Sequence, residues 1–181
     1  MTEHPGVMAK YPAFVNSYRR AYYQNAVSFS PLVPRTGWQQ MLSERLSLPP
    51  PNRGFTWVYS VDGDLGKTYF ANHFRPGKSV VIPSGDHASI YMVISNLIHS
   101  IDVVFFDYPR DKEASFPYAI IEQLKNRSWI NTKYMSCAVI HQPVHVVVTC
   151  NFPPDTSKLS RDRWVGNVWE LCGPDATLVI R

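Results

Sequence analysis

The sequence predicts an α/β fold in which a mostly parallel sheet is flanked by helices. Apolar runs of strand length, such as Val103–Phe106 and Val144–Thr149, show no alternation with polar residues, which is typical of strands buried on both faces. Between such runs lie segments with apolar residues at helical spacing, for example Ala88–His99. Because strand-like and helix-like segments alternate along the chain, βαβ units are favoured over a sandwich or a bundle.

Further elements follow from the same two patterns and from the positions of proline. We expect a short helical element within the first thirty residues and a helix over Gly37–Leu48, which Pro49–Pro51 end. The remaining expected elements are the strand Phe55–Tyr59, the helix Lys67–Phe74, the strand Ser79–Ile82, the helix Phe116–Leu124 and a last strand Thr177–Ile180. We therefore assign residues 1–50 to a helical linker or oligomerisation segment and residues 51–181 to the main domain.

The composition excludes several classes of protein. Hydrophobic residues make up 45% of the 181 residues and charged residues 18%, which argues against disorder. The net charge of +4 allows an anionic partner but does not require one. The 3 cysteines form no CxxC pair, so neither a disulfide framework nor a structural zinc site is predicted. No apolar run is long enough to span a bilayer, and we expect a soluble intracellular protein without a membrane partner.

The strongest chemical signal is a glycine-rich loop between the first expected strand and the next helix. Glycines let backbone N–H groups close around phosphate oxygens, Lys67 can reach the β- and γ-phosphates, and Thr68 can ligate Mg²⁺. Ser60 replaces the first glycine of GxxxxGK[ST], and the loop is one residue longer than that pattern. The predicted nucleotide-binding residues are Ser60, Asp62, Gly63, Asp64, Leu65, Gly66, Lys67 and Thr68. A surface turn that spells Gly-Lys-Thr is the alternative.

Polar residues end two further expected strands. Asp107 follows Val103–Phe106 and is predicted to hold Mg²⁺ together with Thr68. Asn151 follows the later buried strand, and its amide can bond both the γ-phosphate and the attacking water. Each residue taken alone is equally explained as a turn residue. Since parallel strands bind ligands at their carboxyl ends, we expect both residues to meet Lys67 there and to act in catalysis with it.

These residues resemble the helicase domain of the replication-associated (Rep) proteins of small circular single-stranded DNA viruses, which are superfamily 3 helicases. The matching motifs are Trp57–Tyr59 with Gly66–Ala71, Val103–Arg110, Ile121–Asn126 with Thr132–Tyr134, Val146–Asp155 and Leu159–Trp164. The resemblance covers about Pro34–Trp164, and the long loop is similar to the nanovirus, alphasatellite and circovirus style. It implies a P-loop NTPase of AAA+-like architecture that uses ATP and Mg²⁺.

The resemblance also implies partners and further site residues. The family's motor assembles as a ring, usually a hexamer, around single-stranded DNA, in the host nucleus if the protein is viral. Lys125 and Lys133 match the basic positions of its DNA-contacting hairpin and Arg127 lies close by, so these three residues are predicted to bind DNA; a solvated basic turn is the alternative. Arg163 matches the arginine finger that reaches a neighbouring subunit's nucleotide, with Arg161 in reserve, although either can be an ordinary surface arginine.

Two departures from the family's pattern shape the expectations. Rep proteins normally begin with an endonuclease domain, and none fits before Pro34, so we expect either a truncation or a standalone helicase module that does not nick DNA. No acid follows Asp107 directly, which leaves the water-activating group open among Asp107, Asp111 and Glu113.

A histidine pair and two other classes of function are the alternatives to this expectation. His141 and His145 are predicted to lie in a strand or turn, about 13 Å apart if extended, and not to bind a metal. A P-loop kinase of a small metabolite is the alternative enzyme. A nucleotide-gated DNA-binding or assembly module with little turnover is the non-catalytic alternative.

Overall fold

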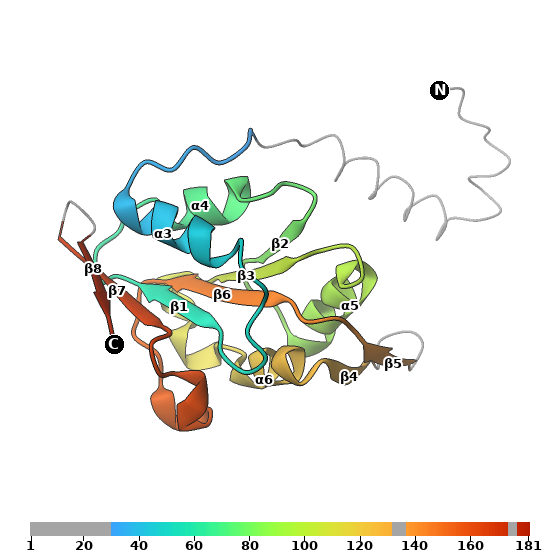
Figure 1. Ribbon diagram of the computed structural model, residues 1–181. Helices are drawn as coiled ribbons and strands as arrows, with labels where there is room; N and C mark the ends of the chain where they lie inside the picture. The colour runs from blue at the N-terminus through green and yellow to red at the C-terminus, as the bar shows by residue number, and fades with distance from the viewer. Residues whose placement is uncertain (1–29, 132–136, 174–176) are drawn as a thin grey trace, which may run out of the picture. The chain divides into compact units, whose positions relative to one another are not determined.

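The computed structural model describes residues 30–131, 137–173 and 177–181, and its centre is a six-stranded sheet (Figure 1). The sheet order is β2-β3-β6-β1-β7-β8, where every neighbouring pair is parallel except β7 and β8. The strands are β1 (Thr56–Tyr59), β2 (Ser79–Ile82), β3 (Val103–Asp107), β6 (His145–Cys150), β7 (Val168–Cys172) and β8 (Thr177–Ile180). The expected α/β class with a mostly parallel sheet is confirmed, and it is compatible with a P-loop NTPase-like fold.

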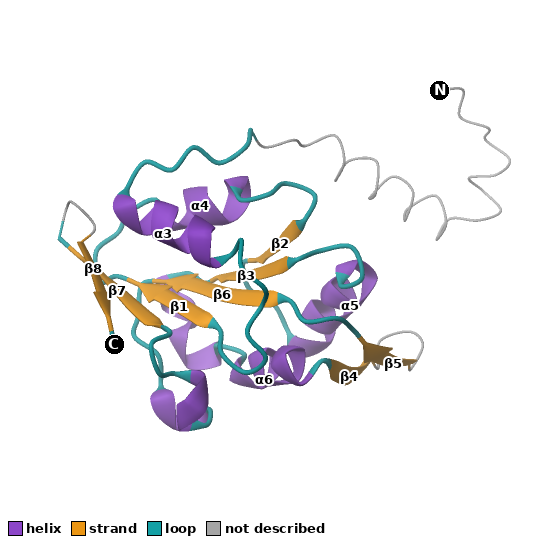
Figure 2. Ribbon diagram, in the orientation of Figure 1, coloured by secondary structure: helices purple, strands orange, loops and turns teal. Residues whose placement is uncertain are grey.

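Helices cover both faces of the sheet (Figure 2). The helices α3 (Gly37–Arg45) and α4 (Lys67–His73) pack on one face, while α5 (His87–Leu97) and α6 (Tyr118–Asn126) pack on the other. The smaller elements are the 3₁₀ helices η1 (Arg110–Ser115), η2 (Thr156–Lys158) and η3 (Arg161–Arg163), and an antiparallel hairpin of β4 (Ser128–Asn131) and β5 (Cys137–Ile140). The hairpin follows α6 directly, at the place where the resemblance implied one.

The two faces of each central strand enter different hydrophobic cores. Val58 on β1 packs with Phe70 and Trp38 beneath α3 and α4, whereas its neighbour Trp57 faces the other core. Trp57 is fully buried and stacks on Tyr118 of α6, with ring centroids 5.8 Å apart. Both faces of these strands are therefore apolar, because each must bury its own side chains against helices.

The expected elements agree with the structure except at some of their ends, and three strands lay outside them: β7, and the pair β4 and β5. The helix expected over Gly37–Leu48 ends at Arg45, and the strand after Asp102 includes Asp107. The strand β7 was not predicted, because Glu170 interrupts its apolar pattern. The short helical element expected within the first thirty residues lies almost wholly outside the described residues.

The compact unit begins before the boundary that the sequence indicated. The chain divides into residues 1–30 and Pro31–Arg181. The helix α3 belongs to the second unit because Trp38, Leu42 and Leu46 are buried against the sheet and α4. The assignment of residues 1–50 to a linker or to oligomerisation stays a prediction. Among the described helices, none has the length and apolar character needed to cross a bilayer.

Candidate nucleotide site

The site lies where three neighbouring parallel strands end together. In the sheet register Tyr59 of β1 stands beside Cys150 of β6, and Asp107 of β3 stands beside Thr149 of β6. The loops that follow β1, β3 and β6 therefore start side by side at the carboxyl edge, where open α/β sheets bind ligands.

The loop after β1 turns through two residues in the left-handed region. Asp64 has φ 59° and Gly66 has φ 75°, and α4 begins at Lys67. Alternation of left-handed residues with ordinary ones points successive backbone N–H groups to one side, which makes an anion-binding concavity. Glycine adopts this conformation without strain, and aspartate tolerates it better than most residues.

Lys67 is buried beneath this loop and not exposed on it. Its side chain is 7% exposed, and Nζ donates a hydrogen bond to Ser60 Oγ at 2.5 Å. Ser60 Oγ donates in turn to the carbonyl oxygen of Asp62. Burial lowers the pKa of the ammonium group of Lys67, with the nearby Asp107 opposing this effect. The serine at the expected glycine position therefore supplies a hydroxyl that holds the lysine.

Asp107 and Asn151 lie at the ends of β3 and β6. Asp107 Oδ1 accepts a hydrogen bond from Thr149 Oγ1 at 2.7 Å, which fixes the carboxylate across the two strands. The side-chain Oδ1 of Asn151 is buried and has no hydrogen-bond partner among the described residues. A buried amide oxygen without a partner is uncommon in native proteins, and this one lies beside the cleft, where it can accept a hydrogen bond.

A cleft of about 530 Å³ joins these groups. It is lined by Gly63, Asp64, Leu65, Gly66, Lys67, Thr68, Tyr69, Pro83, Asp107, Tyr108, Pro109, Cys150 and Asn151. Most of the predicted nucleotide-binding residues thus lie together with Asp107 and Asn151. Ser60 and Asp62 do not line the cleft. Ser60 lies beneath Lys67, and the carbonyl oxygen of Asp62 accepts the hydrogen bond from the Ser60 hydroxyl.

Several lining or supporting residues escaped the sequence analysis. Tyr69 directly follows the motif residue Thr68, so the sequence indicated its position near the site. Pro83, which follows β2, belongs to no motif, so nothing in the sequence indicated that it lines the cleft. Arg110 donates from Nη2 to the carbonyl oxygen of Val61 at 2.5 Å, which ties the loop after β3 to the loop after β1. No local pattern reveals such a contact, because the two residues come from different strands.

The donor set fits a hard divalent cation. Thr68 and Asp107 both line the cleft and offer a hydroxyl and a carboxylate oxygen. Mg²⁺ takes few protein oxygens and keeps waters or substrate phosphates as its other ligands. In the part of the chain that the structure describes, no cluster of three histidine, cysteine, aspartate or glutamate side chains offers a metal site of the all-protein kind.

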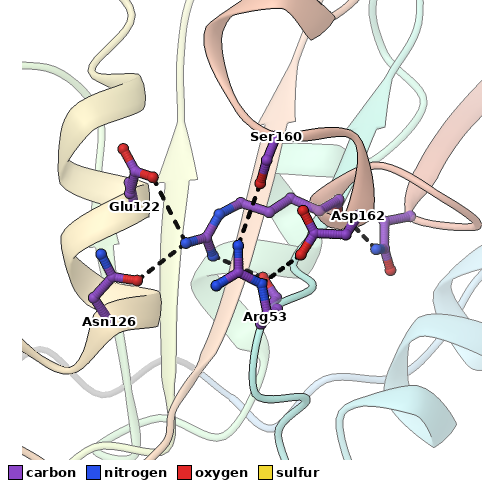
Figure 3. Close-up of polar contacts among 7 residues, drawn as sticks. Arg53, Glu122, Asn126, Ser160 and Asp162 are labelled. Carbon is purple, nitrogen blue, oxygen red and sulfur yellow. Dashed lines mark hydrogen bonds and ion pairs between the residues drawn. The ribbon is translucent and has the colours of Figure 1, made fainter.

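Arg163 does not fit the predicted role of an arginine finger. Its side chain is 1% exposed, and its guanidinium donates to the carbonyl oxygen of Arg53 at 3.0 Å and to Asn126 Oδ1 at 3.1 Å. Glu122 Oε1 lies 3.8 Å from Nη2, and Figure 3 shows Glu122 and Asn126 reaching in from α6. Arg163 therefore joins α6 to the segment before β1. Arg161, the reserve candidate, is exposed.

The predicted DNA-binding residues fall into three different situations. Lys125 is 6% exposed, and its Nζ donates to the carbonyl oxygens of Pro51 at 2.5 Å and Val144 at 3.3 Å, so it is not presented to DNA. Arg127 is exposed and ends α6 with φ 61°. Lys133 lies outside the described residues.

His141 and His145, which lie four residues apart, have separate backbone partners. His141 Nδ1 lies 2.6 Å from the carbonyl oxygen of Gln142, and His145 Nε2 lies 2.9 Å from that of Leu48. Burial lowers the pKa of both imidazoles. Each histidine thus has a structural contact of its own.

The fold and this cleft define an α/β protein with a cleft at the carboxyl edge of a mostly parallel sheet. The chain is a homologue of viral replication proteins. It is 36% identical over 129 residues to Para-Rep C7 of Faba bean necrotic yellows C7 alphasatellite, covering 70% of this chain and 45% of that protein. It is 34% identical over 145 residues to Para-Rep C2 of Subterranean clover stunt C2 alphasatellite, covering 79% of this chain and 50% of that one.

A nanovirus protein shows the same relationship. The master replication protein of Banana bunchy top virus is 32% identical over 120 residues, covering 66% of this chain and 41% of that protein. The resemblance drawn from the motifs is therefore confirmed. The chain spans about half the length of the curated relatives it matches. No protein-family model matches the chain.

Proposed function

We propose that this chain is the ATP-driven motor of a DNA-replication protein, a helicase or translocase that hydrolyses ATP in the cleft at the carboxyl edge of the sheet. The observation that carries the proposal is the meeting of Lys67, Asp107 and Asn151 in one cleft at the ends of β1, β3 and β6. The homology to replication proteins supports the DNA-linked role.

Each residue of the cleft has a distinct task in this proposal. The backbone of the loop binds the phosphates, and Lys67 moves its ammonium group from Ser60 to the β- and γ-phosphates. Thr68 and Asp107 would hold Mg²⁺, which would neutralise phosphate charge, and Thr149 keeps the carboxylate of Asp107 oriented. The Asn151 amide orients the attacking water, which would give its buried Oδ1 a partner.

The proposal includes an assembly. Ring formation, with six subunits as the expected number, would bring an arginine of one subunit to the γ-phosphate of the next. The exposed Arg161 suits this role, because the guanidinium of Arg163 is already bound within its own subunit. Arg127 and Lys133 are the proposed contacts to the phosphates of single-stranded DNA.

The direct test compares ATP hydrolysis by the purified full chain with and without single-stranded DNA. Stimulation by DNA supports the motor. Phosphorylation of a small metabolite without any effect of DNA would replace it with the metabolite kinase.

A second candidate, a nucleotide-gated DNA-binding module with little turnover, is favoured by one contact. The bond from Lys67 to Ser60 holds the ammonium group away from a substrate phosphate, and breaking it costs free energy. If this contact limits turnover, Ser60→Gly raises the rate of hydrolysis. Tight DNA and nucleotide binding with no turnover in the unaltered chain would favour this candidate over the motor.

A further inference from the structure

The side chain of Gln39 on α3 is buried against the nucleotide-site loop. It is 1% exposed, although α3 otherwise buries apolar residues such as Trp38 and Leu42. Its Nε2 donates to the carbonyl oxygen of Gly66 at 3.1 Å, and its Oε1 accepts from the backbone N–H of Arg35 at 2.7 Å. Burying an amide is unfavourable unless both ends are bonded, and here both ends are bonded, so the amide is held in one orientation.

The bond from Gln39 fixes the direction of a peptide group in the loop. The Gly66 carbonyl oxygen also accepts the N–H of Phe70 at 2.9 Å, the first backbone bond of α4. In a planar trans peptide the C=O of Gly66 and the N–H of Lys67 point in opposite directions. The Lys67 N–H therefore points away from Gln39, and Gly66 and Lys67 line the cleft while Gln39 does not.

The space at Gly66 is matched to this contact. A Cβ at Gly66 would lie 2.7 Å from Gln39 Nε2, and the φ of +75° also disfavours other residues there. A second contact joins the same segment to the site, because the Arg35 guanidinium lies 4.0 Å from the ring centroid of Tyr69, which lines the cleft. The segment from Arg35 to Gln39 thus contacts the loop and α4 at two points.

We propose that Gln39 is a positioning residue of the nucleotide site, whose amide orients the Gly66–Lys67 peptide so that the Lys67 backbone N–H donates to a nucleotide phosphate. This inference rests on the proposed function of the cleft as an ATP site. It makes α3, which the sequence analysis assigned to a linker or oligomerisation segment, a part of the nucleotide site.

The test measures the binding of a fluorescent ATP analogue with Mg²⁺ to the full chain. Gln39→Met removes both bonds at similar volume, and Gln39→Asn keeps a neutral amide that is one methylene too short to reach Gly66 and Arg35 together. Loss of one oriented phosphate contact is expected to raise Kd by about ten-fold in both variants. The matched control is Gln40→Met, because Gln40 is exposed on the same helix and bonds only Glu44 in its side-chain contacts. Its Kd stays within about two-fold of the original.

Thermal unfolding without nucleotide and the stoichiometry of binding separate positioning from loss of fold. A purely structural role lowers the bound fraction and the melting temperature but leaves the Kd of the folded molecules unchanged, and that result overturns the inference. If Gln39→Met does not fold, the neutral Gln39→Asn decides alone. An unaltered chain that binds no nucleotide overturns the proposed function as well, whereas an unaltered chain that binds while both variants bind equally overturns this inference only.

Discussion

Lys125 lies in the last turn of α6, and its ammonium group is buried between the carbonyl oxygens of Pro51 and Val144. Lys125→Met leaves both carbonyls without this donor, so the free energy of unfolding should fall by about 1–3 kcal/mol. The affinity for single-stranded DNA should stay unchanged, because the ammonium group does not reach the surface. Urea unfolding and fluorescence anisotropy with a labelled strand measure the two effects.

The exposed Arg127 serves as the control: Arg127→Met should weaken DNA binding and leave stability unchanged. Loss of DNA affinity in Lys125→Met would show that Lys125 binds DNA, as the family resemblance implied.

The pKa of Lys125 gives a prediction on pH. Burial, with a contribution from the nearby Arg163, lowers this pKa from 10.5 to about 8. Between these values the unfolded chain keeps a proton that the folded chain has released, so the contribution of Lys125 to the free energy of unfolding increases as pH rises through this range. Urea unfolding at about pH 7.5 and pH 9.5 should show the gain in the unaltered chain relative to Lys125→Met. Equal responses of both proteins to pH would show that the pKa is not lowered.

At the scale of elements, the pairing of β3 with β6 places the Thr149 hydroxyl 2.7 Å from Asp107 Oδ1. Thr149→Val removes this hydroxyl and frees the carboxylate to rotate. We expect hydrolysis to need a several-fold higher Mg²⁺ concentration for half-maximal rate, at a stability cost of about 1 kcal/mol. Thr56→Val is the control, because Thr56 is also buried but begins β1 at the opposite edge of the sheet. An equal increase in the Mg²⁺ concentration for half-maximal rate in both variants would show that Thr149 does not act on the metal site.

Elements with strong local signals were predictable from the sequence. The strand Ser79–Ile82 has the predicted ends, and β3 and β6 were recognised because both of their faces are apolar. Partly exposed Glu170 interrupts the apolar pattern of β7, so that strand became visible only through its pairing with β1. The convergence of Lys67, Asp107 and Asn151 was predictable because the carboxyl ends of parallel strands share one edge.

Contacts between distant segments were not predictable. A basic residue in a motif is exposed or buried according to partners far away in the chain, such as Pro51 for Lys125 and Arg53 for Arg163. The role of Gln39 was not predicted for the same reason, because its hydrogen-bond partner Gly66 lies in a distant part of the sequence. Motif matching therefore located the loops correctly, but it did not tell structural cations from those available to a ligand.

At the scale of the whole molecule, the proposed ring makes each nucleotide site depend on two subunits. Lys67→Ala and Arg161→Ala should each be inactive alone, because one loses the phosphate ligand of its own site and the other the arginine given to its neighbour. Mixing equal amounts before assembly pairs an intact loop with an intact arginine at some interfaces. Random mixing predicts roughly a quarter of the original ATPase rate. Co-purification of an untagged variant with a tagged one confirms that the two variants share rings, and no recovery in mixed rings would exclude Arg161 as the residue acting in trans.

The most direct test of the ATP site is hydrolysis by the Lys67→Ala variant. Lys67 is buried and bonded to Ser60, so the fold of the variant is first checked by its melting temperature and circular dichroism. We predict Mg²⁺-dependent ATP hydrolysis by the unaltered chain, stimulated by single-stranded DNA, and a loss of at least about a hundred-fold in folded Lys67→Ala. Hydrolysis at the original rate by the folded variant would contradict the assignment of this cleft as the catalytic site.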